Sequence, residues 1–81
     1  MAHPVLNEDW SEYDNKKIRD GRDRSRVSCE EVWEREYIAE KLKKHHPTKT
    51  KEQIHAAIKS CCDQGASRVR EHFIDCVAGK L

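Results

Sequence analysis

The sequence predicts a small all-α domain, with three helices over residues 28–81 and a mostly irregular N-terminal arm over residues 1–27. Apolar residues recur at helical spacing after residue 28, and the helical segments there begin with capping patterns. Residues 1–27 hold only four of the fourteen Leu, Ile, Val and Phe residues and show no periodicity. We therefore expect this charged arm to be largely extended or disordered.

The composition limits what the chain can be. Its 81 residues are enough for one small domain. Leu, Ile, Val and Phe make up about 17% of the chain, but 16 basic and 15 acidic residues nearly cancel, which argues against a fully disordered chain. So short a chain excludes a large enzyme core with a deep pocket. Neither an apolar run of membrane-spanning length nor a basic-then-apolar leader is present, so we expect no membrane association and a reducing cytoplasm.

The first helix is predicted over residues 29–45. Ser28 and Glu31 have the spacing of a capping box, and Pro47 ends the helix because the residue before a proline avoids helical backbone. Acidic residues come early in this segment and lysines late, which complements the helix dipole. Its expected apolar stripe consists of Cys29, Val32, Trp33, Tyr37 and Leu42.

Two shorter helices follow, predicted over residues 51–63 and 68–79. Thr50 and Gln53 have capping-box spacing before the second helix, and Ser67 is placed to cap the third. Gly65 suits the left-handed position just beyond a helix end. Three short helices cannot be stable alone, so they must pack on one another.

Two alternatives stay open for the arm. Val5, Leu6 and Trp10 dock on the folded part, or Trp10 belongs to a short recognition motif for a partner.

A pattern of short motifs, D-x-K, G, D-R-x-R-V and E-x-x-Y, is formed by Asp14, Lys16, Gly21, the Asp23–Val27 stretch and Glu34-x-x-Tyr37. It resembles the D-x-K, G, D-R-x-R-I and E-x-x-Y-W pieces of a family of small bacterial proteins of unknown function. The family's tryptophan after the tyrosine is Ile38 here, and its short glycine turn is replaced by residues 43–49. The resemblance implies a compact, mostly helical bacterial protein and no particular activity.

The four cysteines are predicted to pack as small buried hydrophobic residues. A disulfide is not expected in a reducing compartment. A zinc site is a remote alternative, because His72 and Cys76 lie one helical turn apart and Cys61 or Cys62 faces them across a short turn. Cys76 with His72 is also the pair nearest to a nucleophile–base arrangement, but the sequence offers no oxyanion site or pocket to complete it. We therefore assign no catalytic residue and no cofactor.

Two basic clusters are the candidate nucleic-acid contacts. One lies in the arm and the other surrounds the turn between the first two helices. The seven candidate residues are Arg22, Arg24, Arg26, Lys43, Lys44, Lys49 and Lys51. Arg68 and Arg70, near the start of the last helix, loosely fit a helix-turn-helix.

We expect a non-enzymatic protein-interaction module or self-associating domain, because a small core often leaves an apolar patch for a partner to cover. Weak nucleic-acid binding through the basic arm and turn is the alternative, although a pI near 7.7 is low for a dedicated nucleic-acid binder.

Overall fold

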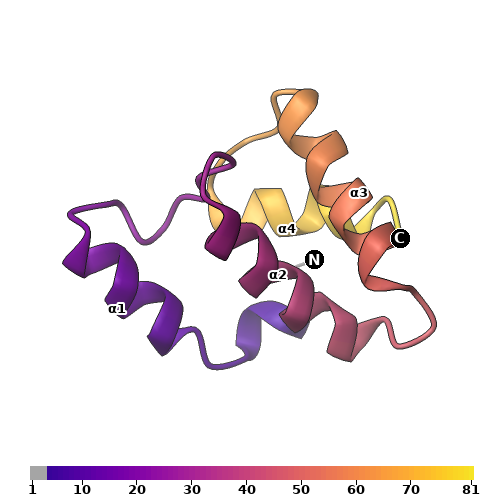
Figure 1. The fold of residues 1–81 in the computed structure, drawn as a ribbon, viewed down its shortest axis with the longest axis horizontal. Coiled ribbons are helices and arrows are strands. Elements are labelled where there is room, and N and C mark those ends of the chain that lie inside the picture. The colour runs from indigo at the N-terminus through magenta and orange to yellow at the C-terminus, as the bar shows by residue number, and fades with distance from the viewer. Residues whose placement is uncertain (1–3) are drawn as a thin grey trace.

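The computed structural model describes residues 4–81, in which four α-helices and one short 3-10 helix are arranged as in Figure 1. Their bounds are Pro4–Asn7 for the 3-10 helix, Ser11–Arg19 for α1, Val32–His45 for α2, Lys51–Asp63 for α3 and Arg70–Ala78 for α4. α2 packs on α3, α3 on α4, and the 3-10 helix on α2. The mostly helical prediction is confirmed, although these residues hold four α-helices rather than three. Residues 1–3 of the predicted arm lie outside the described residues.

The expectation of an irregular arm is wrong for residues 11–19, which form α1. Tyr13 and Lys17 lie one helical turn apart and both point inward, with exposed fractions of 0% and 2%. The inward stripe of α1 is thus a tyrosine and a lysine rather than aliphatic residues. A search for apolar periodicity does not find such a helix, because lysine counts as polar.

α2 begins at Val32, three residues later than expected, and Ser28 does not form the predicted capping box. Its N-cap is Glu31, which has an extended backbone and makes no capping bond through its side chain. The main-chain N–H of Ser28 donates to the Glu34 carboxylate instead, at 3.0 Å. Residues 28–31 thus lie outside the helix, and Ser28 contacts it through Glu34. The end of α2 at His45, before Pro47, agrees with the prediction.

α3 has the predicted bounds, and Thr50 and Gln53 form the expected capping box. Gly65 follows with φ of +73°, the left-handed backbone that favours glycine. α4 starts two residues later than predicted, because the chain before it is extended. Residues 26 and 69 form an isolated antiparallel bridge, in which the Val27 N–H donates to the Arg68 carbonyl at 2.6 Å.

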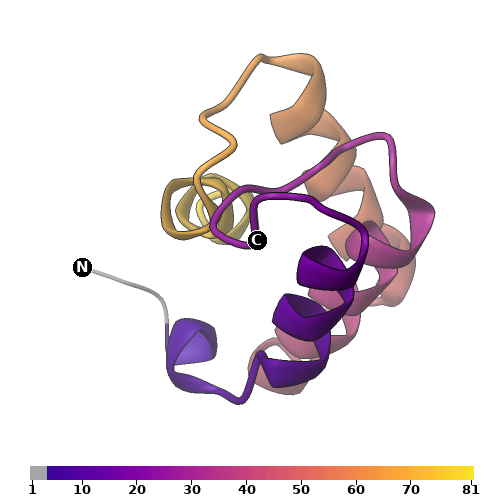
Figure 2. The same ribbon diagram turned by 90° about the vertical axis from the view of Figure 1, so that its left-hand side faces the viewer.

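The N-terminal residues are part of the core. Val5 has no exposed surface, and Trp10 is 4% exposed, with its indole N–H donating to the Val5 carbonyl at 3.0 Å. Trp10 and Tyr13 meet edge to face, with ring centroids 5.3 Å apart. Of the two alternatives for Trp10, the structure therefore shows the docked one. Figure 2 shows the segment after α1 passing beside α4, which is seen nearly end-on.

All four cysteines form disulfides, Cys29 with Cys62 and Cys61 with Cys76, so the prediction of free cysteines in the core is wrong. Neighbouring residues in the last turn of α3 thus have different partners, one in the segment before α2 and one in α4. The Cα–Cα distances are 6.1 and 6.2 Å, within the range for a disulfide. The sequence did not show which segments approach Cys61 and Cys62, because both partners come from other elements of the fold.

In the part of the chain that the structure describes, every helix is too short or too polar to cross a membrane.

Candidate functional site

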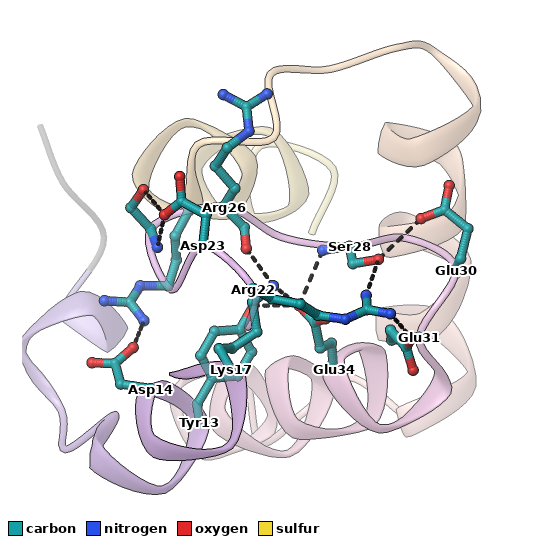
Figure 3. Close-up of polar contacts among 12 residues, drawn as sticks. Tyr13, Asp14, Lys17, Arg22, Asp23, Arg26, Ser28, Glu30, Glu31 and Glu34 are labelled. Carbon is teal, nitrogen blue, oxygen red and sulfur yellow. Dashed lines mark hydrogen bonds and ion pairs between the residues drawn. The ribbon is translucent and has the colours of Figure 1, made fainter. Parts of the chain in front are cut away.

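A buried carboxylate organises the contact between α1, α2 and the segment that joins them (Figure 3). Glu34, in the first turn of α2, has no exposed surface. Its Oε1 atom accepts hydrogen bonds from the Tyr13 hydroxyl at 2.6 Å, the Lys17 ammonium at 2.9 Å and the Ser28 N–H at 3.0 Å. Lys17 also donates to the Arg26 carbonyl at 2.7 Å. One side chain of α2 therefore ties down both α1 and residues 26–28.

The electrostatics of this cluster suit a permanent structural role. Lys17 and Glu34 form an ion pair whose side chains are 3% and 0% exposed. Burial, followed by the hydrogen bond to Glu34, raises the pKa of the Tyr13 hydroxyl well above its ordinary value. Tyr13 therefore stays protonated and donates its hydrogen bond at all physiological pH values. The Glu34 Oε2 atom, also buried, has no hydrogen-bond partner among the described residues.

The predicted arm cluster lies on the segment between α1 and α2, where Arg22, Arg24 and Arg26 are all exposed. Arg22 is already paired with Glu31 at 2.6 Å and donates to the Ser28 hydroxyl at 3.3 Å. The Arg26 side chain points away from the Glu34 cluster (Figure 3). Arg24 and Arg26 are therefore the members of this cluster that face solvent most openly.

The second basic cluster, at the turn between α2 and α3, is partly used by the fold. Lys43 donates to the carbonyls of Pro47 at 2.9 Å and Lys49 at 2.6 Å, which holds the turn in place. Lys51 lies 3.7 Å from Glu40. Lys44 is exposed and Lys49 is half-buried.

The structure does not bring the two basic clusters together. Residues 22–26 lie before the start of α2, whereas residues 43–51 surround its end (Figure 1). A helix of 14 residues is about 20 Å long, so the clusters are separated by roughly that distance.

The helix-turn-helix interpretation of α3 and α4 is also not supported. Arg68 donates to the carbonyl of Cys62, at the end of α3, and to that of Ala66 in the loop that follows. Arg70 pairs with Asp14 at 2.8 Å and stacks over the Trp10 ring, 4.8 Å from its centroid. Both arginines are thus bound within the fold, whereas a recognition helix would present such residues to the edges of the bases.

The remote zinc prediction is wrong for its proposed ligands, because Cys61, Cys62 and Cys76 are all disulfide-bonded and offer no thiolate. Within residues 4–81 no group of three His, Cys, Asp or Glu side chains is arranged to hold a metal ion. The His72 ring lies 3.4 Å from the Ser67 hydroxyl. Because its sulfur is held in a disulfide, Cys76 cannot act with His72 as a nucleophile.

A polar groove lies between the start of α1 and α2, with a volume of about 250 Å³. The residues that line it are Asp9, Glu12, Tyr37, Glu40, Lys41 and Lys44. Tyr37 is held firmly: its ring lies 5.5 Å from both Trp10 and Tyr13, and its hydroxyl donates to the Asp9 carbonyl at 3.4 Å. Trp33, one turn earlier on α2, is half-buried beneath the Lys16 ammonium, 4.4 Å from the ring centroid.

Next to this groove, Glu8 joins the N-terminal segment to the end of α2. Its carboxylate pairs with the His45 ring and with Lys41, the latter at 3.5 Å. The hydrogen bond from His45, with the nearby charges of His45 and Lys41, holds the pKa of Glu8 below its usual value. Lys41 also donates to the Asp9 carbonyl at 2.8 Å, so its charge is largely committed within the fold.

Sequence reasoning missed both the groove and the Glu34 cluster as sites. Asp9, Glu12 and Glu40 come from separate segments, and only the position of α1 places them together. A signal for the Glu34 cluster was present in the resemblance motif Glu34-x-x-Tyr37, which was interpreted without a contact for the glutamate.

No family model, no curated protein and no solved structure matches this chain. The resemblance to the small bacterial family therefore stays a prediction. Three of the residues that carry the resemblance have structural roles here. Asp14 pairs with Arg70, Gly21 has the left-handed φ of +71°, and Glu34 is the buried acceptor between α1 and α2.

Proposed function

We propose that this protein is a non-enzymatic interaction module that binds another protein through the groove between α1 and α2. This proposal rests on one observation: a fixed aromatic side chain and exposed carboxylates line the same groove. Tyr37 lines the groove, Glu12 and Glu40 are exposed on its walls, and Trp33 is half-buried one turn away on α2. Trp and Tyr are enriched among the residues that dominate binding energy at protein interfaces.

The aromatic residues at this surface are already ordered. Tyr13 lies 5.3 Å from Trp33 and 5.5 Å from Tyr37, measured between ring centroids, and it is completely buried. Because these rings are fixed before a partner arrives, binding costs little side-chain entropy. A rigid anchor of this kind favours recognition of a protein surface without a large rearrangement.

The charges of the groove favour a partner that presents lysine or arginine. Glu12 and Glu40 are exposed, and Asp9 completes an acidic wall. Of the two lysines that line the groove, Lys41 is occupied by Glu8 and the Asp9 carbonyl, whereas Lys44 is exposed. A basic side chain of the partner would therefore meet complementary charge beside the Tyr37 ring, which would set specificity and the rate of association.

A displayed library of random peptides tests this proposal directly, because it samples basic and acidic sequences alike. The wild-type protein is expected to enrich sequences that contain Lys or Arg. The double charge reversal Glu12→Lys/Glu40→Lys should abolish that enrichment, whereas Lys59→Glu on the exposed face of α3 should leave it unchanged. No enrichment by the wild type, or equal enrichment by the charge-reversal variant, would contradict the proposal.

Self-association is one form of the same proposal, and sedimentation equilibrium measures it directly. A dimer that weakens on the Glu12→Lys/Glu40→Lys reversal would identify a second copy of the chain as the partner. A dimer unaffected by the reversal would place self-association on a different surface and count against the groove.

Nucleic-acid binding is the second candidate, favoured by the exposed side chains of Arg24 and Arg26. The separation of the two basic clusters weakens this candidate, because few phosphates would be contacted at once. Random-sequence duplex at about 50 mM salt discriminates the two functions. Steeply salt-dependent binding that is lost in Arg24→Ala/Arg26→Ala would favour nucleic acid, and no binding would remove this candidate.

The two disulfides bear on where the protein works. Stable disulfides are typical of oxidising compartments. We therefore propose an oxidising compartment in place of the reducing cytoplasm that the sequence predicted.

A further inference from the structure

The two disulfides differ in their exposure to solvent, although they involve neighbouring residues of α3. Cys61 has no exposed surface and belongs to the core. Cys62, Cys29 and Cys76 are half-buried at its edge. One disulfide therefore joins two partly exposed cysteines, and the other joins a partly exposed cysteine to a buried one.

This difference decides how each bond responds to a thiol. In thiol–disulfide exchange, a thiolate attacks one sulfur and the other sulfur leaves as a thiolate. Attack on Cys61 is blocked by the core. Attack on Cys76 would expel the thiolate of Cys61 into apolar surroundings, where the charged form is disfavoured. At the Cys29–Cys62 bond both sulfurs belong to half-buried residues, so neither route ends in a buried thiolate.

The surroundings of Cys62 also favour exchange. The guanidinium of Arg68 donates to the Cys62 carbonyl at 3.2 Å, which places a fixed positive charge beside this residue. Positive charge nearby stabilises a thiolate. In the other disulfide, the Cys76 sulfur faces the Gln64 amide oxygen at 3.9 Å. Among the described residues, no cation is in hydrogen-bonding contact with Cys76.

Contacts other than the disulfide hold the segment that contains Cys29. The Val27 N–H donates to the Arg68 carbonyl, the Arg70 N–H donates to the Ser25 carbonyl, and the Ser28 N–H donates to Glu34. The Cys61–Cys76 bond meanwhile keeps α3 joined to α4. Opening Cys29–Cys62 therefore leaves the two sulfurs near each other in a folded chain, so that the bond can form again.

We propose that Cys29–Cys62 is a reversible thiol-exchange site, while Cys61–Cys76 is a permanent structural bond. A low-molecular-weight thiol, as its thiolate, attacks one sulfur of the Cys29–Cys62 bond. A mixed disulfide forms, and the other cysteine leaves as a thiolate that takes a proton from water. A second thiol molecule then attacks the mixed disulfide, which yields the reagent's own disulfide and two protein thiols. Two electrons pass from the two reagent thiols to the protein bond.

Reduced glutathione is the probe that tests this proposal on the full chain in non-denaturing buffer. After timed exposure, the reaction is quenched with iodoacetamide and the alkylated cysteines are located by mass spectrometry. We expect glutathione adducts and alkylation at Cys29 and Cys62, at a rate at least about tenfold above that at Cys61 and Cys76. The helical circular dichroism signal should persist, and oxidised glutathione should restore the bond.

Two matched variants serve as controls. Cys29→Ser/Cys62→Ser keeps only the Cys61–Cys76 bond and should be inert to glutathione under the same conditions. Cys61→Ser/Cys76→Ser keeps the Cys29–Cys62 bond, which should open at a rate similar to that in the wild type. The wild-type measurement stands alone if either variant fails to fold. Equal opening rates for both bonds, earlier opening of Cys61–Cys76, or opening only with global unfolding would overturn the proposal.

Discussion

Replacing Glu34 with leucine tests whether the buried carboxylate holds the N-terminal helix to the rest of the protein. The substitution removes the acceptor for Tyr13, Lys17 and Ser28 at once. Lys17 then stays buried as an unpaired charge, with only the Arg26 carbonyl left as a partner. The remaining contacts of α1 are the packing of the Tyr13 ring, the Asp14–Arg70 ion pair and the Lys16 ammonium over Trp33, and none of them involves Lys17 as the donor.

The size of the effect follows from burial. Breaking an ion pair in which both side chains are almost fully buried costs about 3–5 kcal/mol of unfolding free energy. A domain of this length has on the order of 4–12 kcal/mol in total, at the usual stability per residue. Glu34→Leu should therefore lower the melting temperature by on the order of 20 °C. Unfolding in guanidinium chloride, followed by circular dichroism with the disulfides intact, measures the change in unfolding free energy. Thermal unfolding under the same conditions measures the change in melting temperature.

Two further variants separate charge burial from general damage. Glu34→Leu/Lys17→Met replaces both charges with apolar groups and should recover part of the loss, because it removes the unpaired buried charge while Tyr13 and Ser28 still lack their acceptor. Glu36→Gln, on the exposed side of the same helix, should change the unfolding free energy by less than about 0.5 kcal/mol. A loss of unfolding free energy below about 1 kcal/mol for Glu34→Leu, or no recovery in the double variant, would contradict the role assigned to the buried Glu34 carboxylate.

Three other outcomes are expected, each measurable by thermal unfolding of the oxidised protein. Gly65→Ala should cost about 1 kcal/mol, because the residue has φ of +73° and open space around it, so that backbone strain alone sets the penalty. Arg70→Ala should lower the unfolding free energy by about 1–2 kcal/mol, since it removes a partly buried ion pair with Asp14 and a cation stacked on two aromatic rings. As a control, Lys59→Ala removes an exposed ion pair and should lower it by less than about 0.5 kcal/mol. The lowered pKa of Glu8 stabilises the fold above about pH 4.5, and this contribution disappears as the pH falls through the lowered pKa. Glu8→Gln should accordingly flatten the acid limb of the stability profile, and an unchanged slope would contradict the assignment.

The parts of the fold that could be predicted are those fixed by neighbours in the chain. The capping box of α3 and the glycine after it each depend on residues within a few positions, and both are confirmed. α1 was missed because its inward positions are Tyr13 and Lys17, and a lysine is buried only where a carboxylate from another element neutralises it. The sequence contains that glutamate, but no local pattern shows that the two meet.

The disulfides and the groove were unpredictable for the same reason. Cys29 and Cys62 are 33 residues apart, and their pairing depends on the irregular path of residues 20–31, which tertiary contacts hold in place. The candidate nucleic-acid residues were identified by charge alone. Charge in the sequence does not show that Lys43 is bonded to two carbonyls or that Arg22 is paired with Glu31.

The most direct test of the whole arrangement is a disulfide map of the oxidised protein. Trypsin should release peptides 27–35, 60–68 and 71–80 as one covalently linked assembly, because 60–68 carries both neighbouring cysteines. Fragmentation between Cys61 and Cys62 assigns the partners, and we expect Cys61 with Cys76 and Cys62 with Cys29. Intact mass should be lower than that of the reduced chain by four hydrogen atoms. Unlinked peptides carrying free thiols, or the opposite pairing, would contradict the way this structure joins its N-terminal half to α3 and α4.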